Sequence, residues 1–352
     1  MARSRREFLE HFLLAAGGAT LGSSGCSSHC AAPVDLDAQV SRAGFREGSG
    51  PFPEPGYRAL AVSGELARRE EALWALMTPC RLCPRSCGAD RAGGETGVCS
   101  SGRWFKVASY GPHFGEEPPF VGRRGSGTIF FSNCNLLCLY CQNWEINHRG
   151  DGEVTSHPEL ARMMLRLQAR GCHNINLVTP THIVPHLVRA VRLAAGQGLR
   201  LPLVYNTGGY DSPETLRLLD GVVDIYLPDF KYQNSEVASR LSAGAPGYAE
   251  HAAAAIAEMH RQVGSLRVED GVAVRGLLIR HLVLPENLAD TDRFVRWVAE
   301  TLGPETPVNL MSQYRPEHRA RQHPPLDRRL TREEWSQALQ WAREAGLSRY
   351  TA

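Results

Sequence analysis

The sequence predicts an α/β protein built on a partial (β/α)6 barrel. From residue 127 onward, short apolar and often β-branched segments alternate with amphipathic ones. Strands that alternate with helices pair in parallel, because each crossover between parallel strands needs about a dozen residues. The six units are too few for a closed eight-fold barrel, and they fit a partial barrel better than an open doubly wound sheet.

The individual elements follow from this alternation. Strands are expected at 128–132, 175–179, 203–206, 222–228, 277–283 and 308–313. Helices are expected at 66–77, 157–170, 183–195, 213–219, 248–263, 290–302 and 332–345. Asp270-Gly271 predicts the tight turn of a hairpin inserted before the fifth strand.

The composition is that of an ordinary globular protein. Of the 352 residues, 43% are hydrophobic and 22% are charged, and the formal net charge is +2. A nearly neutral chain gives no reason to expect a nucleic-acid partner. The ten cysteines are the unusual feature, and most of them fall into tight clusters, which favours metal binding over disulfides.

The N-terminus predicts a targeting signal. Arg5-Arg6, then Phe8-Leu9 and an apolar run at 12–21, are typical of a twin-arginine signal. That run is too short to span a bilayer, and Cys26 would be the lipidated residue if the signal is that of a lipoprotein. Export or membrane attachment is therefore expected, with a cytoplasmic location as the alternative.

Five segments are expected along the chain. A signal at 1–30 is followed by a flexible linker at 31–65, which is rich in Gly and Pro. A Cys-rich segment at 66–126 precedes the partial barrel at 127–315. The chain ends in a loop and helix at 316–352.

Three cysteines lie directly after the first expected strand. Cys134, Cys138 and Cys141 have the spacing Cx3Cx2C, and no fourth cysteine follows nearby. In parallel α/β folds such a loop lies at the carboxyl edge of the sheet, where active sites gather. Zinc and ordinary iron–sulfur clusters take four ligands, whereas three thiolates can hold a [4Fe-4S] cluster and leave one iron open to a small molecule.

The segment GSGTIFFSNCNLLCLYCQN, with its C-x3-C-x-aromatic-C ending, resembles the radical S-adenosylmethionine (SAM) enzymes. It looks like the branch related to the pyruvate formate-lyase activating enzyme, over residues 80 to 314. The resemblance implies a [4Fe-4S] cluster on Cys134, Cys138 and Cys141, with SAM on the fourth iron. It implies that SAM is reductively cleaved to a deoxyadenosyl radical that abstracts hydrogen, the cofactor supplying the difficult chemistry.

Later strand ends supply candidate SAM contacts. Thr179 and Thr181 follow the second strand, where the family usually has a glycine-rich segment; the common Gly-Gly-Glu pattern is absent here. Asn206 begins a segment, NTGG, whose glycines would let backbone approach a ligand closely, or would simply form a turn. Asp229 and Lys231 resemble the Asp-x-Lys of activating enzymes, which lies near SAM. An exposed ion pair of little consequence is the alternative.

A second cysteine group precedes the barrel. Cys80, Cys83, Cys87 and Cys99 have the spacing Cx2Cx3Cx11C, with several glycines between the last two. Four thiolates on short loops can close a structural zinc site or a second iron–sulfur cluster, and the spacing does not decide between them.

The resulting functional expectation is a radical SAM enzyme, an oxidoreductase of the activating-enzyme kind that takes hydrogen from a protein glycine. It would need SAM, a reductant such as flavodoxin or ferredoxin, and a protein substrate. Two alternatives stay open: an iron–sulfur electron-transfer protein without SAM chemistry, and a zinc-stabilised binding module.

Overall fold

The computed structural model describes residues 53–351 of the chain. The expected twin-arginine signal, the lipoprotein site at Cys26 and most of the expected linker lie outside these residues. The end of that linker differs from the expectation, because helix α3 (Gly56–Val62) forms there. Tyr57 of α3 is fully buried, and its hydroxyl donates a hydrogen bond to the Leu201 carbonyl at 3.0 Å.

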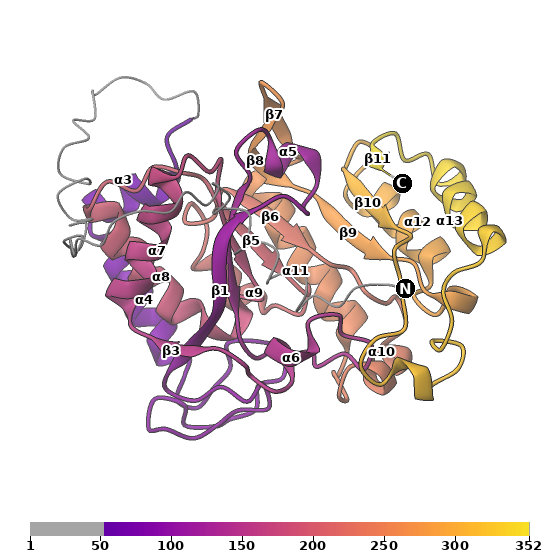
Figure 1. Cartoon of the computed structure of the whole chain (residues 1–352), viewed down its shortest axis with the longest axis horizontal. Coiled ribbons are helices and arrows are strands. Elements are labelled where there is room, and N and C mark those ends of the chain that lie inside the picture. The colour runs from indigo at the N-terminus through magenta and orange to yellow at the C-terminus, as the bar shows by residue number, and fades with distance from the viewer. Residues whose placement is uncertain (1–52, 352) are drawn as a thin grey trace, which may run out of the picture. The chain divides into compact units, whose positions relative to one another are not determined.

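Five strands run parallel at the centre of the molecule (Figure 1). They are β2 (Ser126–Phe131), β4 (Ile175–Val178), β5 (Leu203–Thr207), β6 (Ile225–Pro228) and β8 (Val272–Leu277), paired in chain order. A three-stranded parallel sheet contains β9 (Ile279–Leu282), β10 (Val308–Met311) and β11 (Tyr350–Thr351). A parallel bridge between Asp229 and Arg280 joins the two sheets. The order of β2, β4, β5, β6, β8/β9 and β10 is that of the expected six-unit partial barrel.

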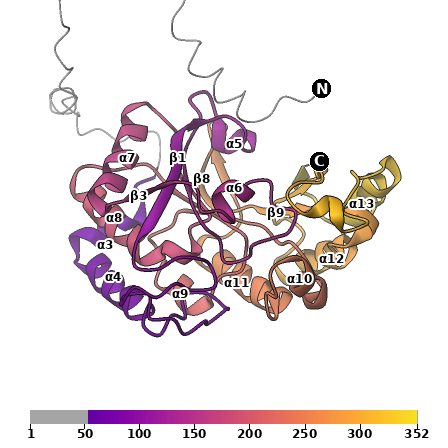
Figure 2. The same ribbon diagram turned by 60° about the horizontal axis from the view of Figure 1, so that its bottom comes forward.

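Helices follow most of these strands, and their bounds agree with the hydrophobic pattern to within a few residues. Of these helices, α4, α7 and α8 lie at one end of the sheet and α12 and α13 at the other, with α9 and α11 between them (Figures 1 and 2). The helices after α3 are α4 (Glu65–Ala75), α5 (Pro118–Val121), α6 (Trp144–Asn147), α7 (His157–Ala169), α8 (Val184–Gly196), α9 (Pro213–Arg217), α10 (Ser235–Leu241), α11 (Tyr248–Val263), α12 (Thr291–Thr301) and α13 (Arg332–Glu344). Three short 3-10 turns complete them, η1 (Thr181–Ile183), η2 (Pro285–Asn287) and η3 (Ala320–Gln322).

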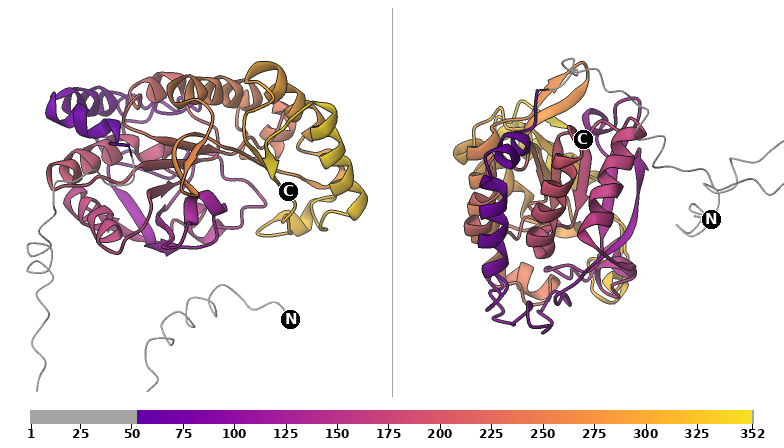
Figure 3. Two further views of the ribbon diagram at one scale, coloured as in Figure 1. Left: turned by 90° about the horizontal axis from the view of Figure 1, so that it is seen from above. Right: turned by 90° about the vertical axis from the view of Figure 1, so that its left-hand side faces the viewer.

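Between residues 106 and 127 the sequence predicts only short strands and turns, whereas the structure has one nine-residue strand there. Strand β1 (Phe105–His113) pairs antiparallel with β2 on one side and with β3 (Glu153–Thr155) on the other. At the far edge, β7 (Arg267–Glu269) and β8 form the hairpin expected at Asp270-Gly271. Both turn residues have positive φ, 48° and 79°, as a two-residue hairpin turn of type I′ requires. The hairpin stands out at the top of the molecule in the right-hand view of Figure 3.

The two faces of the central sheet are covered by different partners. Along β5 and β6, Leu203, Tyr205 and Tyr226 belong to the main core beneath the helices. The alternate residues Val204, Ile225 and Leu227 pack instead with Phe120 of α5, on the inner face of the curved sheet. The Asn174 side chain, just before β4, donates to the Phe120 carbonyl at 2.9 Å. Helix α5 therefore fills the barrel at the amino ends of its strands.

Within the described part of the chain, no helix is both long and apolar enough to cross a membrane.

Replacing Phe120 with alanine tests this filling of the barrel. Because the ring is fully buried, Phe120→Ala should lower the free energy of unfolding by about 3–5 kcal/mol, from lost apolar burial and the cavity left behind. Phe114→Ala is the matched control, since that ring is 58% exposed, and its effect should stay within about 0.5 kcal/mol. Chemical denaturation followed by circular dichroism measures both, and equal effects would contradict the packing described.

Candidate functional site

The Cx3Cx2C loop begins three residues after β2 and ends just before α6. Cys138 is buried, and Cys134 and Cys141 are partly exposed. Asn133 and Leu137 have positive φ, 74° and 54°, which bends the loop sharply on either side of Cys134. The expected position at the carboxyl end of the first parallel strand is therefore what the structure shows.

Each of the three sulfurs accepts a hydrogen bond from a different part of the chain. The Leu136 amide lies 3.3 Å from Cys134 Sγ, and Asn147 Nδ2 lies 3.3 Å from Cys141 Sγ. The Ser242 hydroxyl, at the end of α10, lies 3.2 Å from Cys138 Sγ. Donors directed at sulfur stabilise thiolates and tune the potential of any cluster bound to them.

Burial keeps the thiols of Cys134 and Cys141 neutral in the absence of metal. It raises the pKa of Cys134 to about 12, with the neighbouring Cys138 adding to the effect. Burial and Cys138 also raise the pKa of Cys141. A metal that replaces the protons would convert all three to thiolates. Three convergent thiols with donors to each sulfur fit a cluster held by three cysteines.

Asp229 and Lys231 meet next to this loop. Lys231 Nζ lies 2.6 Å from Asp229 Oδ2, and both side chains are largely shielded from water. Burial would lower the pKa of Lys231, but the Asp229 carboxylate outweighs it and holds that pKa well above its usual value. The ammonium is also close enough to interact electrostatically with the thiolate forms of Cys138 and Cys141. The pair is partly buried beside the cysteine loop, unlike a solvated surface ion pair.

The two threonines after β4 have different surroundings. Thr179 has a positive φ of 61°, and its amide donates to the Asn206 carbonyl at 2.9 Å. Thr181 is buried, and its hydroxyl donates to Asp211 Oδ1 at 2.8 Å. Thr207 also donates to Asp211, at 2.6 Å. Thr181 thus belongs to a buried network that ties the ends of β4 and β5 together. This arrangement indicates that Thr181 holds the strand ends in place rather than contacting a cofactor directly.

The two glycines of the NTGG segment serve close packing within the protein. A Cβ on Gly209, which has a φ of 78°, would lie 2.2 Å from the Asp229 carbonyl oxygen. A Cβ on Gly208 would lie 2.6 Å from Leu136 of the cysteine loop. Glycine here allows the ends of β5 and β6 and the cysteine loop to approach one another.

A buried polar group inside the barrel was not predicted. Arg280 of β9 forms ion pairs with Glu116 and Glu117, which precede α5. Asn309 of β10 donates to Glu117 Oε1 at 2.7 Å, and Arg280 also reaches Asn206 Oδ1 at 3.4 Å. Burial would raise the pKa of Glu117, but Arg280 and Asn309 hold it below its usual value. The partners are far apart in sequence, so no local pattern predicts these contacts. Strand alternation shows only that Arg280 and His281 point to opposite faces of the sheet.

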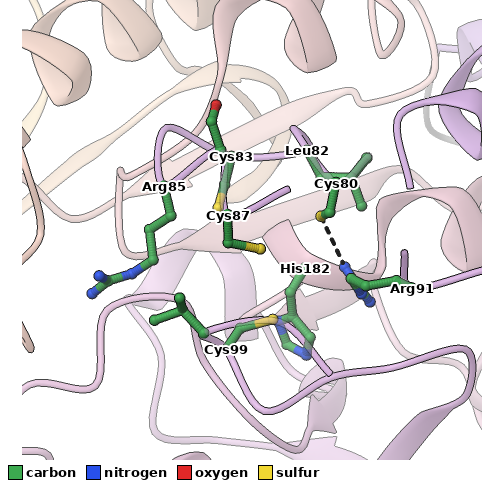
Figure 4. A pocket seen from close by; sticks show the side chains of 10 residues that line it. Cys80, Leu82, Cys83, Arg85, Cys87, Arg91, Cys99 and His182 are labelled. Atoms are coloured by element: carbon green, nitrogen blue, oxygen red, sulfur yellow. Dashed lines mark hydrogen bonds between the residues drawn. The ribbon is translucent and has the colours of Figure 1, made fainter. Parts of the chain in front are cut away.

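The second cysteine group comes together around one small cavity (Figure 4). Cys80, Cys83, Cys87 and Cys99 all line it, together with Arg85, Arg91 and His182. Burial raises the pKa of Cys83 to about 12 and also raises that of Cys80. The eight cysteines of the described residues are all free thiols, and Cys172 is buried apart from both groups.

His182 belongs to this cavity, although no sequence pattern predicts that position. Its i, i+4 partner His186 lies elsewhere, 3.0 Å from His157. His182 Nε2 donates to the Ser132 carbonyl at 2.9 Å. Burial lowers the pKa of His182 to about 3, with Arg91 adding to the effect, so the ring is neutral.

Comparison with known proteins agrees with this geometry. The radical SAM superfamily model matches residues 128–298, which contain the three-cysteine loop and the Asp229–Lys231 pair. An uncharacterized protein of Methanocaldococcus jannaschii, MJ0674, is 33% identical over 277 residues, 76% of this chain and 75% of that protein. A second uncharacterized protein of that organism, MJ0808, is 23% identical over 266 residues, 70% and 73% of the two chains. The chain described here belongs to the radical SAM superfamily, which implies a [4Fe-4S] cluster, SAM and the reaction class of radical SAM enzymes.

Proposed function

We propose that Cys134, Cys138 and Cys141 hold the [4Fe-4S] cluster and that the protein activates a partner protein by taking hydrogen from one of its glycines. The observation that carries the proposal is the Asp229–Lys231 pair. It has the spacing of activating enzymes, and Lys231 lies close to Leu136 of the cysteine loop, since a Cβ on Gly208 would be 2.6 Å from Leu136 and 3.6 Å from Lys231. The cluster, when bound with SAM, supplies the one-electron cleavage and the radical.

The residues around the loop would orient the cofactors and exclude water. Leu136, Leu139 and Tyr140 are between 1% and 8% exposed, so they shield the cysteines from solvent. The Lys231 ammonium can bind a carboxylate of a ligand, with Asp229 holding it in place. Asn206 and the strained Thr179 backbone lie at neighbouring strand ends, where they can contact the rest of SAM. A low-potential flavodoxin or ferredoxin is the proposed reductant.

Cleavage of SAM tests the proposal directly. Full-length protein, reconstituted anaerobically with iron and sulfide and reduced with dithionite, should form deoxyadenosine from SAM. Cys138→Ala should reduce this by about 100-fold or more, because a cluster with two protein ligands is not retained. Cys172→Ala is the matched control, a buried thiol outside both cysteine groups, and should cleave SAM at the wild-type rate.

The same assay separates the activating role from other radical SAM reactions. Tritium or deuterium should pass into deoxyadenosine from a glycine of the protein substrate. Cluster-loaded protein that neither binds nor cleaves SAM would refute the proposal, and hydrogen taken only from a small molecule would refute its activating part.

The hydrogen bond from Ser242 gives a second prediction. Removing a donor to Cys138 Sγ destabilises the more negative, reduced cluster, so Ser242→Ala should lower the midpoint potential by an amount on the order of tens of millivolts. Ser239→Ala on the same helix, an exposed position, is the control. An EPR-monitored redox titration measures both, and an unchanged potential in Ser242→Ala would show that this donor does not act on the cluster.

A further inference from the structure

The four-cysteine cavity is built for a charged occupant. Its void is about 10 Å³, bordered by the four thiols. Arg91 is 1% exposed beside it, with one guanidinium nitrogen 3.9 Å from Cys80 Sγ and the others donating to the Gly102 carbonyl. Among the described carboxylates, none forms an ion pair with Arg91. A buried guanidinium with only neutral partners is costly, so an anionic centre made of thiolates is its natural counter-charge.

His182 adds an independent indication that the cavity takes an occupant. It is 2% exposed and lines the cavity. With Nε2 donating to Ser132, its buried Nδ1 has no hydrogen-bond partner among the residues the structure describes. An unsatisfied buried nitrogen beside converging thiols points to a polar or metallic group.

Four converging thiols can hold either zinc or a four-iron cluster. The buried charge of Arg91 suits the negative charge of both, so the choice between them rests on what lies next to the cavity.

This cavity is joined to the Cys134 loop by direct contacts. Asn135, between Cys134 and Cys138, hydrogen bonds to the Cys83 thiol. Asn133, next to Cys134, donates to the carbonyl of Ser100, the residue that follows Cys99, at 3.0 Å. A hydrogen bond between the neighbour of Cys134 and the neighbour of Cys99 therefore connects the two cysteine groups.

Two more side chains reinforce the connection. Arg85, which lines the cavity, donates to the carbonyls of Asn135 and Leu136 and, at 3.0 Å, to that of Ser242. His182 reaches the Ser132 carbonyl, two residues before Cys134. The cavity thus lies against the loop proposed to hold the SAM-binding cluster, and this position favours a second redox cluster over a structural zinc.

We propose that Cys80, Cys83, Cys87 and Cys99 hold a second [4Fe-4S] cluster that passes electrons to the first. Cys87 is exposed, and Val98 beside it is 47% exposed, which gives a donor protein an approach on the outer side. A reduced flavodoxin or ferredoxin gives up one electron to the outer cluster. That electron then passes to the SAM-binding cluster, and SAM accepts it on cleavage. The relay rests on the function proposed for Cys134, Cys138 and Cys141.

Metal content tests the second cluster without any assay of activity. Full-length protein purified anaerobically should contain about eight irons and eight sulfides, with only traces of zinc. Cys80→Ala/Cys83→Ala should retain about four irons and an EPR signal that SAM changes. Cys134→Ala/Cys138→Ala/Cys141→Ala should retain about four irons and a signal that SAM leaves unchanged. About four irons and one zinc per wild-type chain would overturn the proposal.

Reduction kinetics test the relay. With reduced flavodoxin as donor, Cys80→Ala/Cys83→Ala should slow reduction of the SAM-binding cluster by about tenfold or more, while dithionite, which is small, reduces it as in wild type. Reduced wild-type protein should also show magnetic coupling between two EPR signals, lost in both cysteine variants. Equal flavodoxin rates, or two uncoupled signals, would overturn the relay.

A variant that keeps all seven cysteine ligands separates loss of electron transfer from loss of folding. Arg85→Gln should retain both clusters by iron content and slow the flavodoxin-dependent step several-fold, while Arg81→Gln, an exposed arginine of the same loop, should not. An unchanged rate in Arg85→Gln would show that the contacts of Arg85 with the cysteine loop do not contribute to electron transfer. Failure of SAM cleavage with dithionite in fully loaded wild type would instead refute the function of the first site, so the two failures are distinguishable.

Discussion

Two backbone hydrogen bonds at Asp229 hold the two sheets together, and the site depends on them. The Asp229 amide donates to the Thr207 carbonyl of β5 at 2.8 Å, and the next amide, of Phe230, donates to the Arg280 carbonyl of β9 at 2.8 Å. One short segment thereby bridges the five-strand parallel run and the smaller sheet. The same segment carries the carboxylate that holds Lys231 against the cysteine loop, so the geometry of the site follows directly from how the barrel is joined.

Both cysteine groups bring several thiols together on loops, but the charged side chains around the two groups differ. The three-cysteine loop receives its hydrogen bonds from neutral donors and is faced by a lysine whose charge is balanced by Asp229. The four-cysteine cavity is faced by Arg91, whose charge no described carboxylate balances. A site that binds and releases a charged ligand needs a nearby charge that stays balanced when the ligand leaves, as that of Lys231 is by Asp229. A site that keeps its metal group can bury an unpaired charge such as that of Arg91.

Much of the barrel could be predicted from the sequence, because parallel strands buried on both faces form apolar runs that helical segments separate. The three-cysteine loop was placed correctly for the same reason. Around β1 the sequence predicts only short strands and turns, because Gly111 and Pro112 interrupt the pattern of a long strand that tertiary pairing stabilises. The Arg280–Glu117 pair and the position of His182 depend on contacts between residues 50 or more apart, which periodicity does not encode.

The position of Phe120 has a consequence for where this protein can be divided. Helix α5 lies before the first barrel strand in the chain, yet its aromatic ring fills the inside of the barrel that follows. Family membership is recognised from residue 128 onward, but a fragment starting there would lack its own interior, and water would enter from the end opposite the cysteines. The region before the barrel is thus an integral part of the folded unit, and its evolution is constrained by the volume that it must occupy as well as by its cysteines.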